Sequence, residues 1–127
     1  MTRTCVETPD APPPIGPYCQ ANLAGPYLLT AATSGADPTN GNQIPTDIAA
    51  QTNQAIDNLQ AILRAGGCEL EDVAKVTAYL ANLDDFGAMN DVYAQRFKHP
   101  FPARSIIQTT LPAGKVAFDA MALRPCT

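Results

Sequence analysis

A chain of 127 residues has about the length of one domain, so we expect a single domain over residues 1–127. The formal charge of −4 and the lack of any run of Lys or Arg argue against a nucleic-acid partner, because phosphate backbones are bound through clustered positive charge. No stretch reaches the roughly 20 apolar residues that span a bilayer, and the N-terminus leads into no apolar signal region, so we expect a cytoplasmic protein without a membrane partner.

The apolar part of the composition predicts a lean hydrophobic core. The apolar fraction of 46% contains many alanines and no tryptophan. A small domain buries a low fraction of its surface, so such a chain favours further burial between identical copies. We therefore expect self-association.

The N-terminal region is expected to be an extended arm with turns. Its first 26 residues hold half of the twelve prolines, which fix φ and cannot occupy a helix interior. Between turn signals, short strand-like runs predict strands over residues 4–7, 19–23 and 27–32. The composition of residues 37–42 predicts a loop.

A helix is predicted where apolar residues begin to recur at three- and four-residue steps. The pattern runs from Ile48 to Leu63 and predicts an amphipathic helix of about five turns. Thr46 or Asp47 can cap its free N–H groups, and the glycine pair at 66–67 can end it.

The C-terminal half predicts one more helix and three strands. The helix begins at Asp84 or Asp85 and runs to Phe97, with an apolar stripe along it. Strands are expected over residues 73–80, 103–110 and 116–123, the last two joined by a hairpin-like connection. This order predicts an α+β fold in which both helices cover one face of one mixed sheet.

Two charges stand among apolar neighbours in the last two strands. Period-two alternation places Arg104 on one face with Ile106, and Asp119 on one face with Met121. Burying a lone charge is costly, so the two should pair with each other, meet a partner subunit or line a cleft. From the residues alone, a structural ion pair is favoured slightly over a ligand site.

If the two charges form a site, their chemical properties suit two different roles. The planar guanidinium of Arg104 can donate two parallel hydrogen bonds to a ligand carboxylate and stays charged at any working pH. Asp119 can orient or deprotonate a water molecule. Asn90, a polar residue on the apolar stripe of the second helix, needs hydrogen-bond partners if buried, whether its role is structural or functional.

No metal site is expected. The four cysteines, Cys5, Cys19, Cys68 and Cys126, show neither a CxxC pair nor a Cys/His spacing, and the chain has one histidine. Structural zinc needs four nitrogen or sulfur ligands. Since nothing marks a secreted compartment, we expect four free thiols.

Three segments carry a resemblance to a known family. They are Ala11-Pro12-Pro13-Pro14-Ile15-Gly16-Pro17-Tyr18-Cys19-Gln20, then Asn82-Leu83-Asp84-Asp85-Phe86 leading to Met89-Asn90-Asp91-Val92-Tyr93, then Phe101-Pro102-Ala103-Arg104-Ser105. In order and spacing they resemble the motifs of the RidA/YjgF family of reactive enamine/imine deaminases, over nearly the whole chain.

The resemblance implies a chorismate-mutase-like α+β fold in a homotrimer, with sites in the clefts between subunits. It implies hydrolysis of 2-aminoacrylate and related 2-imino acids to 2-oxo acids and ammonia, a form of metabolite damage control. No metal or organic cofactor is implied. The alternative is a trimeric protein that binds small carboxylates or client proteins and has lost turnover.

The resemblance also implies roles for single residues. Arg104 matches the arginine that binds the substrate carboxylate, and backbone groups near Ser105 and Ile106 help to hold that carboxylate. Tyr18 matches the tyrosine of the first motif, and Asn90 matches the asparagine of the second helix.

The sequence departs from the family pattern at several site positions. Asp119 stands where the family has a glutamate associated with the attacking water, and Ile106 stands where a cysteine is frequent. Counted without gaps from Tyr18, the family's Ser-Gly pair falls on Ala31 and Ala32. Alternatively, the pair at 34–35 supplies it through a three-residue shift.

Overall fold

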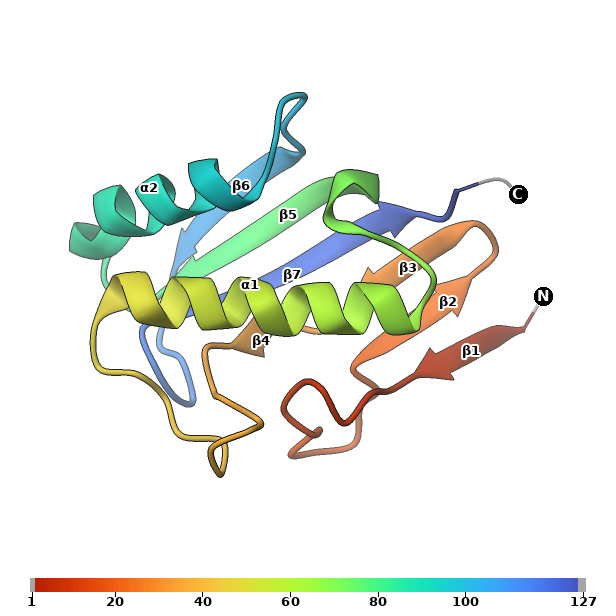
Figure 1. Ribbon diagram of the computed structural model, residues 1–127, viewed down its shortest axis with the longest axis horizontal. Coiled ribbons are helices and arrows are strands. Elements are labelled where there is room, and N and C mark those ends of the chain that lie inside the picture. Colours follow the sequence, from red (N-terminus) through yellow and green to blue (C-terminus); the bar gives the residue numbers. More distant parts are fainter. Residues whose placement is uncertain (1, 126–127) are drawn as a thin grey trace.

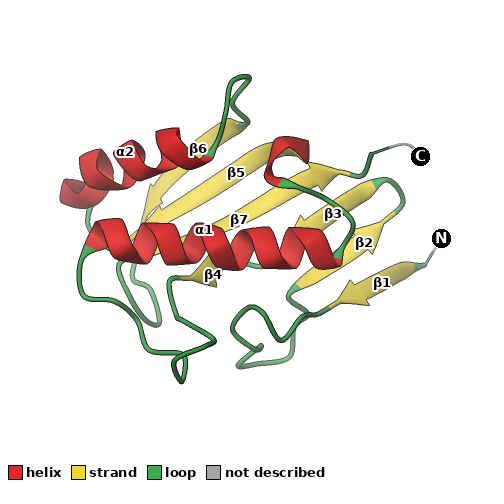
Figure 2. Ribbon diagram, in the orientation of Figure 1, coloured by secondary structure: helices red, strands yellow, loops and turns green. Residues whose placement is uncertain are grey.

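Residues 2–125 are described by a computed structural model, in which two helices lie on one face of a seven-stranded sheet (Figures 1 and 2). The helices are α1 (Ile48–Ala65) and α2 (Phe86–Arg96), and the short 3-10 turns are η1 (Leu70–Asp72) and η2 (Leu83–Asp85). The strands are β1 (Arg3–Val6), β2 (Ala21–Ala24), β3 (Tyr27–Thr30), β4 (Thr33–Ser34), β5 (Val73–Leu80), β6 (Ala103–Gln108) and β7 (Val116–Leu123). The expected α+β class, with both helices on one face, is confirmed.

Helix α1 forms as its sequence predicts. The carboxylate of Asp47 accepts a hydrogen bond from the Ala50 N–H, which caps the N-terminus. The apolar stripe, including Ile56 and Leu59, is fully buried against the sheet. At the C-terminus a side chain at Gly66 would place its Cβ 2.5 Å from Leu28 of β3, so the glycine allows the helix end to approach the sheet.

The sheet has the strand order β1-β2-β3-β7-β5-β6, with β4 pairing separately with β7. Strand β5 lies between β7, to which it is antiparallel, and β6, to which it is parallel. The hairpin-like connection expected between residues 103–110 and 116–123 is therefore wrong. Helix α2 carries the chain from β5 to a parallel β6, as parallel pairing requires a long crossover, and β5 separates β6 from β7.

The strand expected over residues 27–32 is interrupted. Strand β3 ends at Thr30, and the two-residue β4 resumes at Thr33, both paired with β7. Ala31 and Ala32 lie in the break between them. This interruption matters because both alanines line a cavity together with residues of the N-terminal arm.

The two faces of the sheet differ in what covers them. On the face under the helices, Leu28, Val76 and Phe118 are fully buried in the hydrophobic core. On the opposite face, cross-strand pairs leave large apolar side chains exposed: Tyr27 with Leu123, and Leu29 with Met121. No helix within residues 2–125 has the length and apolar character needed to cross a membrane.

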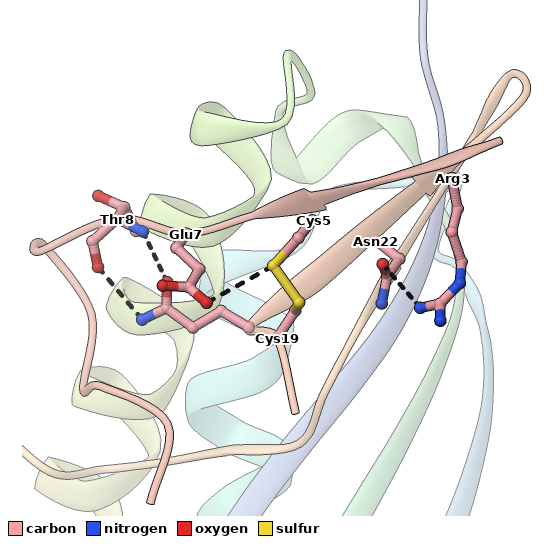
Figure 3. The surroundings of a disulfide bond; sticks show 7 residues. Arg3, Cys5, Glu7, Thr8, Cys19 and Asn22 are labelled. Atoms are coloured by element: carbon pink, nitrogen blue, oxygen red, sulfur yellow. Dashed lines mark hydrogen bonds between the residues drawn. A yellow bond between two sulfur atoms is a disulfide. The ribbon is translucent and has the colours of Figure 1, made fainter. Parts of the chain in front are cut away.

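The expectation of four free thiols is wrong for two cysteines. Cys5 of β1 and Cys19, just before β2, form a disulfide, with 5.8 Å between their Cα atoms (Figure 3). The antiparallel pairing of β1 with β2 brings the two residues within the usual range of Cα separations for a disulfide. Cys68 is a free, buried thiol, and Cys126 lies outside the described residues.

Candidate functional site

Strand register decides on which face of the sheet each predicted site residue lies. Val76 of β5 pairs with Arg104 on one side and with Ala120 on the other, so Arg104 lies on the face that the helices cover. Asp119 pairs with Thr77, one residue further along β5, and therefore lies on the open face. The predicted ion pair between Arg104 and Asp119 is wrong, because the sheet separates the two side chains.

Helix α2 holds Arg104 between aromatic rings. Its guanidinium carbon lies 4.6 Å from the ring centroid of Tyr93 and 5.7 Å from that of Phe86. Such contacts attract the cation without using its N–H donors. Within residues 2–125 the half-buried guanidinium makes no hydrogen bond and no ion pair. Its two-pronged donor set is thus free for an anionic group.

Asn90 occupies the helical turn between these two aromatic residues. Phe86, Asn90 and Tyr93 follow one another at four- and three-residue steps, so they share one face of α2. The Asn90 side chain is half-buried. The structure therefore brings Asn90 to the same face of α2 as the aromatic groups that hold Arg104.

Tyr93 is the buried residue beside the Arg104 guanidinium. Its ring stacks on Phe97 with 4.4 Å between centroids, and its hydroxyl is buried without a hydrogen-bond partner among the described residues. Burial raises the pKa of Tyr93 to about 12, and the nearby charge of Arg104 opposes that rise in part. The phenol is therefore neutral at working pH.

The two residues after Arg104 point to opposite faces of β6. The Ser105 hydroxyl accepts a hydrogen bond of 2.6 Å from Lys75 on the open face, whereas Ile106 packs against the core. Strand β6 is the last strand of the sheet, so half of its backbone groups lack a strand partner within the described residues. These backbone groups are free for the ligand contacts expected near Ser105 and Ile106.

A second group of predicted residues lies around a cavity beside the N-terminal arm. The cavity has a volume of about 470 Å³ and is lined mainly by apolar surface, to which the N-terminal arm and the loop at 111–113 contribute. Tyr18, Ala31 and Ala32 line it, together with Ser34. Gly35 does not line it and packs against the backbone of Gln51, where a Cβ would lie 2.5 Å from the carbonyl oxygen.

The arm that carries Tyr18 is held in place by Gln20, which sequence reasoning missed. The buried Gln20 side chain accepts a hydrogen bond of 2.6 Å from the Thr8 N–H and donates one of 2.8 Å to the Pro12 carbonyl. The Tyr18 hydroxyl accepts a hydrogen bond from the Ile15 N–H. A glutamine beside an arm rich in proline was the available signal, since proline carbonyls need donors from elsewhere.

Asp119 is linked to this cavity by Tyr79, a residue that sequence reasoning also missed. Its half-buried carboxylate accepts a hydrogen bond of 2.7 Å from the hydroxyl of Tyr79, and Tyr79 itself lines the cavity. The hydrogen bond to Asp119 is the largest cause of a raised pKa of Tyr79, with burial second. Tyr79 thus remains a protonated donor at neutral pH.

One cluster of potential metal ligands occurs in residues 2–125. It consists of Cys5, Glu7 and Cys19. The two sulfur atoms are joined in the disulfide, so they are not thiolate ligands in this state (Figure 3).

The chain is similar to known proteins over nearly its whole length. The family model described as endoribonuclease L-PSP matches residues 8–122. A 2-iminobutanoate/2-iminopropanoate deaminase of Capra hircus is 39% identical over 126 residues, which cover 98% of this chain and 92% of the goat protein.

Two solved structures have the same fold. A putative endoribonuclease of Thermotoga maritima has a TM-score of 0.91 at 36% identity, covering 97% of this chain and 98% of its own. The structure of Escherichia coli TdcF with bound serine has a TM-score of 0.89 at 32% identity, covering 96% and 99%. The chain belongs to the endoribonuclease L-PSP family, which is the RidA/YjgF family.

Proposed function

We propose that this protein hydrolyses reactive 2-imino acids, including the imine formed from 2-aminoacrylate, to 2-oxo acids and ammonia. The observation that carries the proposal is the half-buried guanidinium of Arg104, which aromatic rings hold while its hydrogen-bond donors stay free. The family relatives support the substrate class. The goat relative is named for two such imines, and the Escherichia coli relative was solved with serine, a small amino acid that carries a carboxylate.

In the proposed reaction, the substrate carboxylate docks on the two-pronged donor set of Arg104, with backbone groups at Ser105 and Ile106 beside it. A water molecule held by Asp119 adds to the carbon of the C=N bond, and the carboxylate takes up its proton. The C–N bond of the resulting tetrahedral adduct then breaks. The carboxylate passes this first proton to the nitrogen, the hydroxyl proton of the adduct follows through the same carboxylate, and nitrogen leaves as ammonia while the carbon keeps the water oxygen as the carbonyl of the 2-oxo acid.

We propose that the complete site forms between subunits of a homotrimer. Within one chain, Arg104 and Asn90 belong to the helix-covered face, whereas Asp119 belongs to the open face. A second copy that docks beside β6 can present its own arm and Asp119 to this chain's Arg104. The exposed apolar pairs on the open face, Tyr27 with Leu123 and Leu29 with Met121, support such an assembly.

The alternative function is binding of a small carboxylate without turnover. Ala31 and Ala32 at the break between β3 and β4, and the short side chain of Asp119, are the observations that favour it. This alternative keeps the role of Arg104 and removes the role of the water.

One assay separates the two. A PLP-dependent serine or threonine dehydratase generates 2-aminoacrylate, whose disappearance is followed with and without this protein. We expect the protein to accelerate the loss of 2-aminoacrylate and the release of ammonia in proportion to its concentration. Unchanged decay, together with saturable binding of pyruvate, would instead establish the binding protein.

A further inference from the structure

Among residues 2–125, Tyr79 is the one side chain that joins the cavity to the Asp119 carboxylate by a hydrogen bond. Its ring lines the cavity together with Tyr18, Ala31 and Ala32, but Asp119 is not among the lining residues. The Tyr79 hydroxyl donates to Oδ2 of Asp119 over 2.7 Å, a distance within the range of hydrogen bonds from an O–H donor to a carboxylate.

Strand geometry explains why this contact forms. Tyr79 pairs with Ala117 and Asp119 pairs with Thr77, so the two residues are diagonal neighbours on the open face of the antiparallel β5–β7 pair. A diagonal separation of about 7–8 Å is too long for most side chains and within reach of an aromatic one. Leucine or valine at position 79 would leave the Asp119 carboxylate free to rotate.

We propose that Tyr79 is a positioning residue, whose hydroxyl fixes Oδ2 of Asp119 and thereby leaves Oδ1 directed to the attacking water. This inference rests on the proposed hydrolysis and adds a residue to that site. A fixed carboxylate acts on a water molecule in one orientation, and such orientation affects the rate of the chemical step more than substrate binding. The raised pKa of Tyr79 supports the assignment, since the phenol keeps its proton at neutral pH.

The first test is the substitution Tyr79→Phe, which keeps the ring in the cavity wall and removes only the hydroxyl. We expect kcat for 2-aminoacrylate-derived imine to fall about tenfold with little change in KM, because the lost contact acts through Asp119. Tyr27→Phe is the matched control, because it keeps the ring that forms the apolar pair with Leu123 and removes only the hydroxyl. Tyr27 lies on the same face of the sheet, is 50% exposed, and its hydroxyl makes no hydrogen bond within residues 2–125.

A double-mutant cycle distinguishes positioning from shaping of the cavity. If Tyr79 acts through the carboxylate, adding Tyr79→Phe to Asp119→Asn lowers kcat no further than Asp119→Asn alone. If the hydroxyl only shapes the cavity, the two losses multiply, and this result overturns the proposal. The unfolding midpoint of each variant is measured beside its activity, so that a loss of folded protein is not counted as a loss of kcat.

An ultraviolet titration of the tyrosines gives a readout that does not depend on activity. The Tyr79 component is assigned from its absence in Tyr79→Phe, and its pKa should fall in Asp119→Ala, because the carboxylate acceptor that raises it is gone. An unchanged titration would overturn the pairing in solution. A wild-type protein that fails to hydrolyse the imine overturns the proposed function, whereas an active wild type with an equally active Tyr79→Phe variant overturns only the role of Tyr79.

Discussion

The guanidinium carbon of Arg104 lies 4.6 Å from the centroid of the Tyr93 ring, on the face of the sheet opposite to Asp119. The two aromatic contacts stabilise the cation, but they leave its hydrogen-bond donors without partners inside the described chain. A charged group with free donors at a half-buried position is arranged for an anion that comes from outside the subunit.

Substitution of Arg104 should therefore affect activity far more than folding. We expect Arg104→Ala to lower kcat/KM about 100-fold, which corresponds to roughly 3 kcal/mol, since it removes both prongs of the carboxylate contact. Arg104→Lys keeps the charge and loses the planar fork, so it should fall between the wild type and Arg104→Ala. Steady-state kinetics on the three proteins measures the order.

The stability of these variants separates a ligand role from a structural one. Because Arg104 does not pair with Asp119, Arg104→Ala leaves no buried carboxylate without a partner, and chemical denaturation should show a loss of only about 1 kcal/mol from the aromatic contacts. A folded Arg104→Ala protein that binds pyruvate and turns over normally would refute the carboxylate contact. A loss of several kcal/mol would support a structural role.

The local elements of this fold could be predicted because their signals are local. The apolar period from Ile48 to Leu63 and the cap at Asp47 predicted α1, and the run at 73–80 predicted β5 with its correct ends. Strand pairing is not local. A residue pattern in 103–110 contains no information about whether β5 or β7 lies beside it, so the position of β6 was predicted wrongly.

The site shows the same limit. Alternation correctly separated the two faces of each strand, and it selected Arg104 and Asp119 as isolated charges. It could not show that the two lie on opposite faces, because that depends on the register with Val76 and Thr77 of a third strand. The contact of Tyr79 with Asp119 depends on the same register, and for this reason only the structure revealed it.

The Cys5–Cys19 disulfide should stabilise the protein through the loop that it closes. The two cysteines are separated by 14 positions, and a loop of this size contributes about 3 kcal/mol by limiting the unfolded chain. We expect Cys5→Ser to lower the free energy of unfolding by about this amount in urea denaturation without reductant. The double variant Cys5→Ser/Cys19→Ser should lose no more stability than the single variant, since the same bond is removed in both.

Dithiothreitol should destabilise the wild type and leave the stability of the double variant unchanged. Equal responses of the two proteins would contradict the disulfide.

Activity should survive treatment with a metal chelator and with a thiol-blocking reagent. The proposed chemistry uses Arg104, Asp119 and water, and the free Cys68 is buried in the core, where burial raises the pKa of its thiol and makes it a poor nucleophile. The assay is repeated after incubation with EDTA and, separately, with iodoacetamide. Inhibition by EDTA that added zinc reverses would show that a metal takes part.

Tyr93→Phe should stabilise the protein at neutral pH. The substitution removes a buried hydroxyl that has no partner among the described residues, and an unpaired buried polar group costs about 1–3 kcal/mol.

Tyr93→Phe should also change how the stability of the protein responds to alkali. The native pKa of about 12 lies above the usual value of 10, so the fold disfavours the phenolate, and the free energy of unfolding of the wild type should fall as the pH rises from 10 through 12, whereas Tyr93→Phe should lack this loss. Denaturation curves of wild type and Tyr93→Phe between pH 7 and pH 12 test both effects; a less stable variant at pH 7 would show that the hydroxyl has a partner.

The oligomeric state is the simplest test of the proposed assembly. Multi-angle light scattering should give about 40 kDa, three times the 13.4 kDa of one chain. Introducing a charge on the open face, as in Met121→Glu, should shift the mass toward one chain, because it places a carboxylate among the exposed apolar pairs. A mass of one chain for the wild type at micromolar concentration would remove the intersubunit site.

Mixing of two strongly impaired variants tests whether the site is shared between subunits. Arg104→Ala and Asp119→Asn each disable every site of their own homotrimer. If one subunit supplies Arg104 and its neighbour supplies Asp119, a trimer that contains both variants has one site with both residues intact. Random exchange at equal amounts makes about three quarters of the trimers mixed, with one intact site in three, so activity should recover to about a quarter of the wild-type value.

The same experiment contains its own control. A second mixture combines Arg104→Ala with the double variant Arg104→Ala/Asp119→Asn, in which no arrangement restores a site, and it should stay inactive. Subunit exchange is driven by brief exposure to mild denaturant and followed by native mass spectrometry of chains of different mass. Exchange without recovery of activity would mean that one subunit supplies both residues. The structure argues against that result, because Arg104 and Asp119 lie on opposite faces of the sheet.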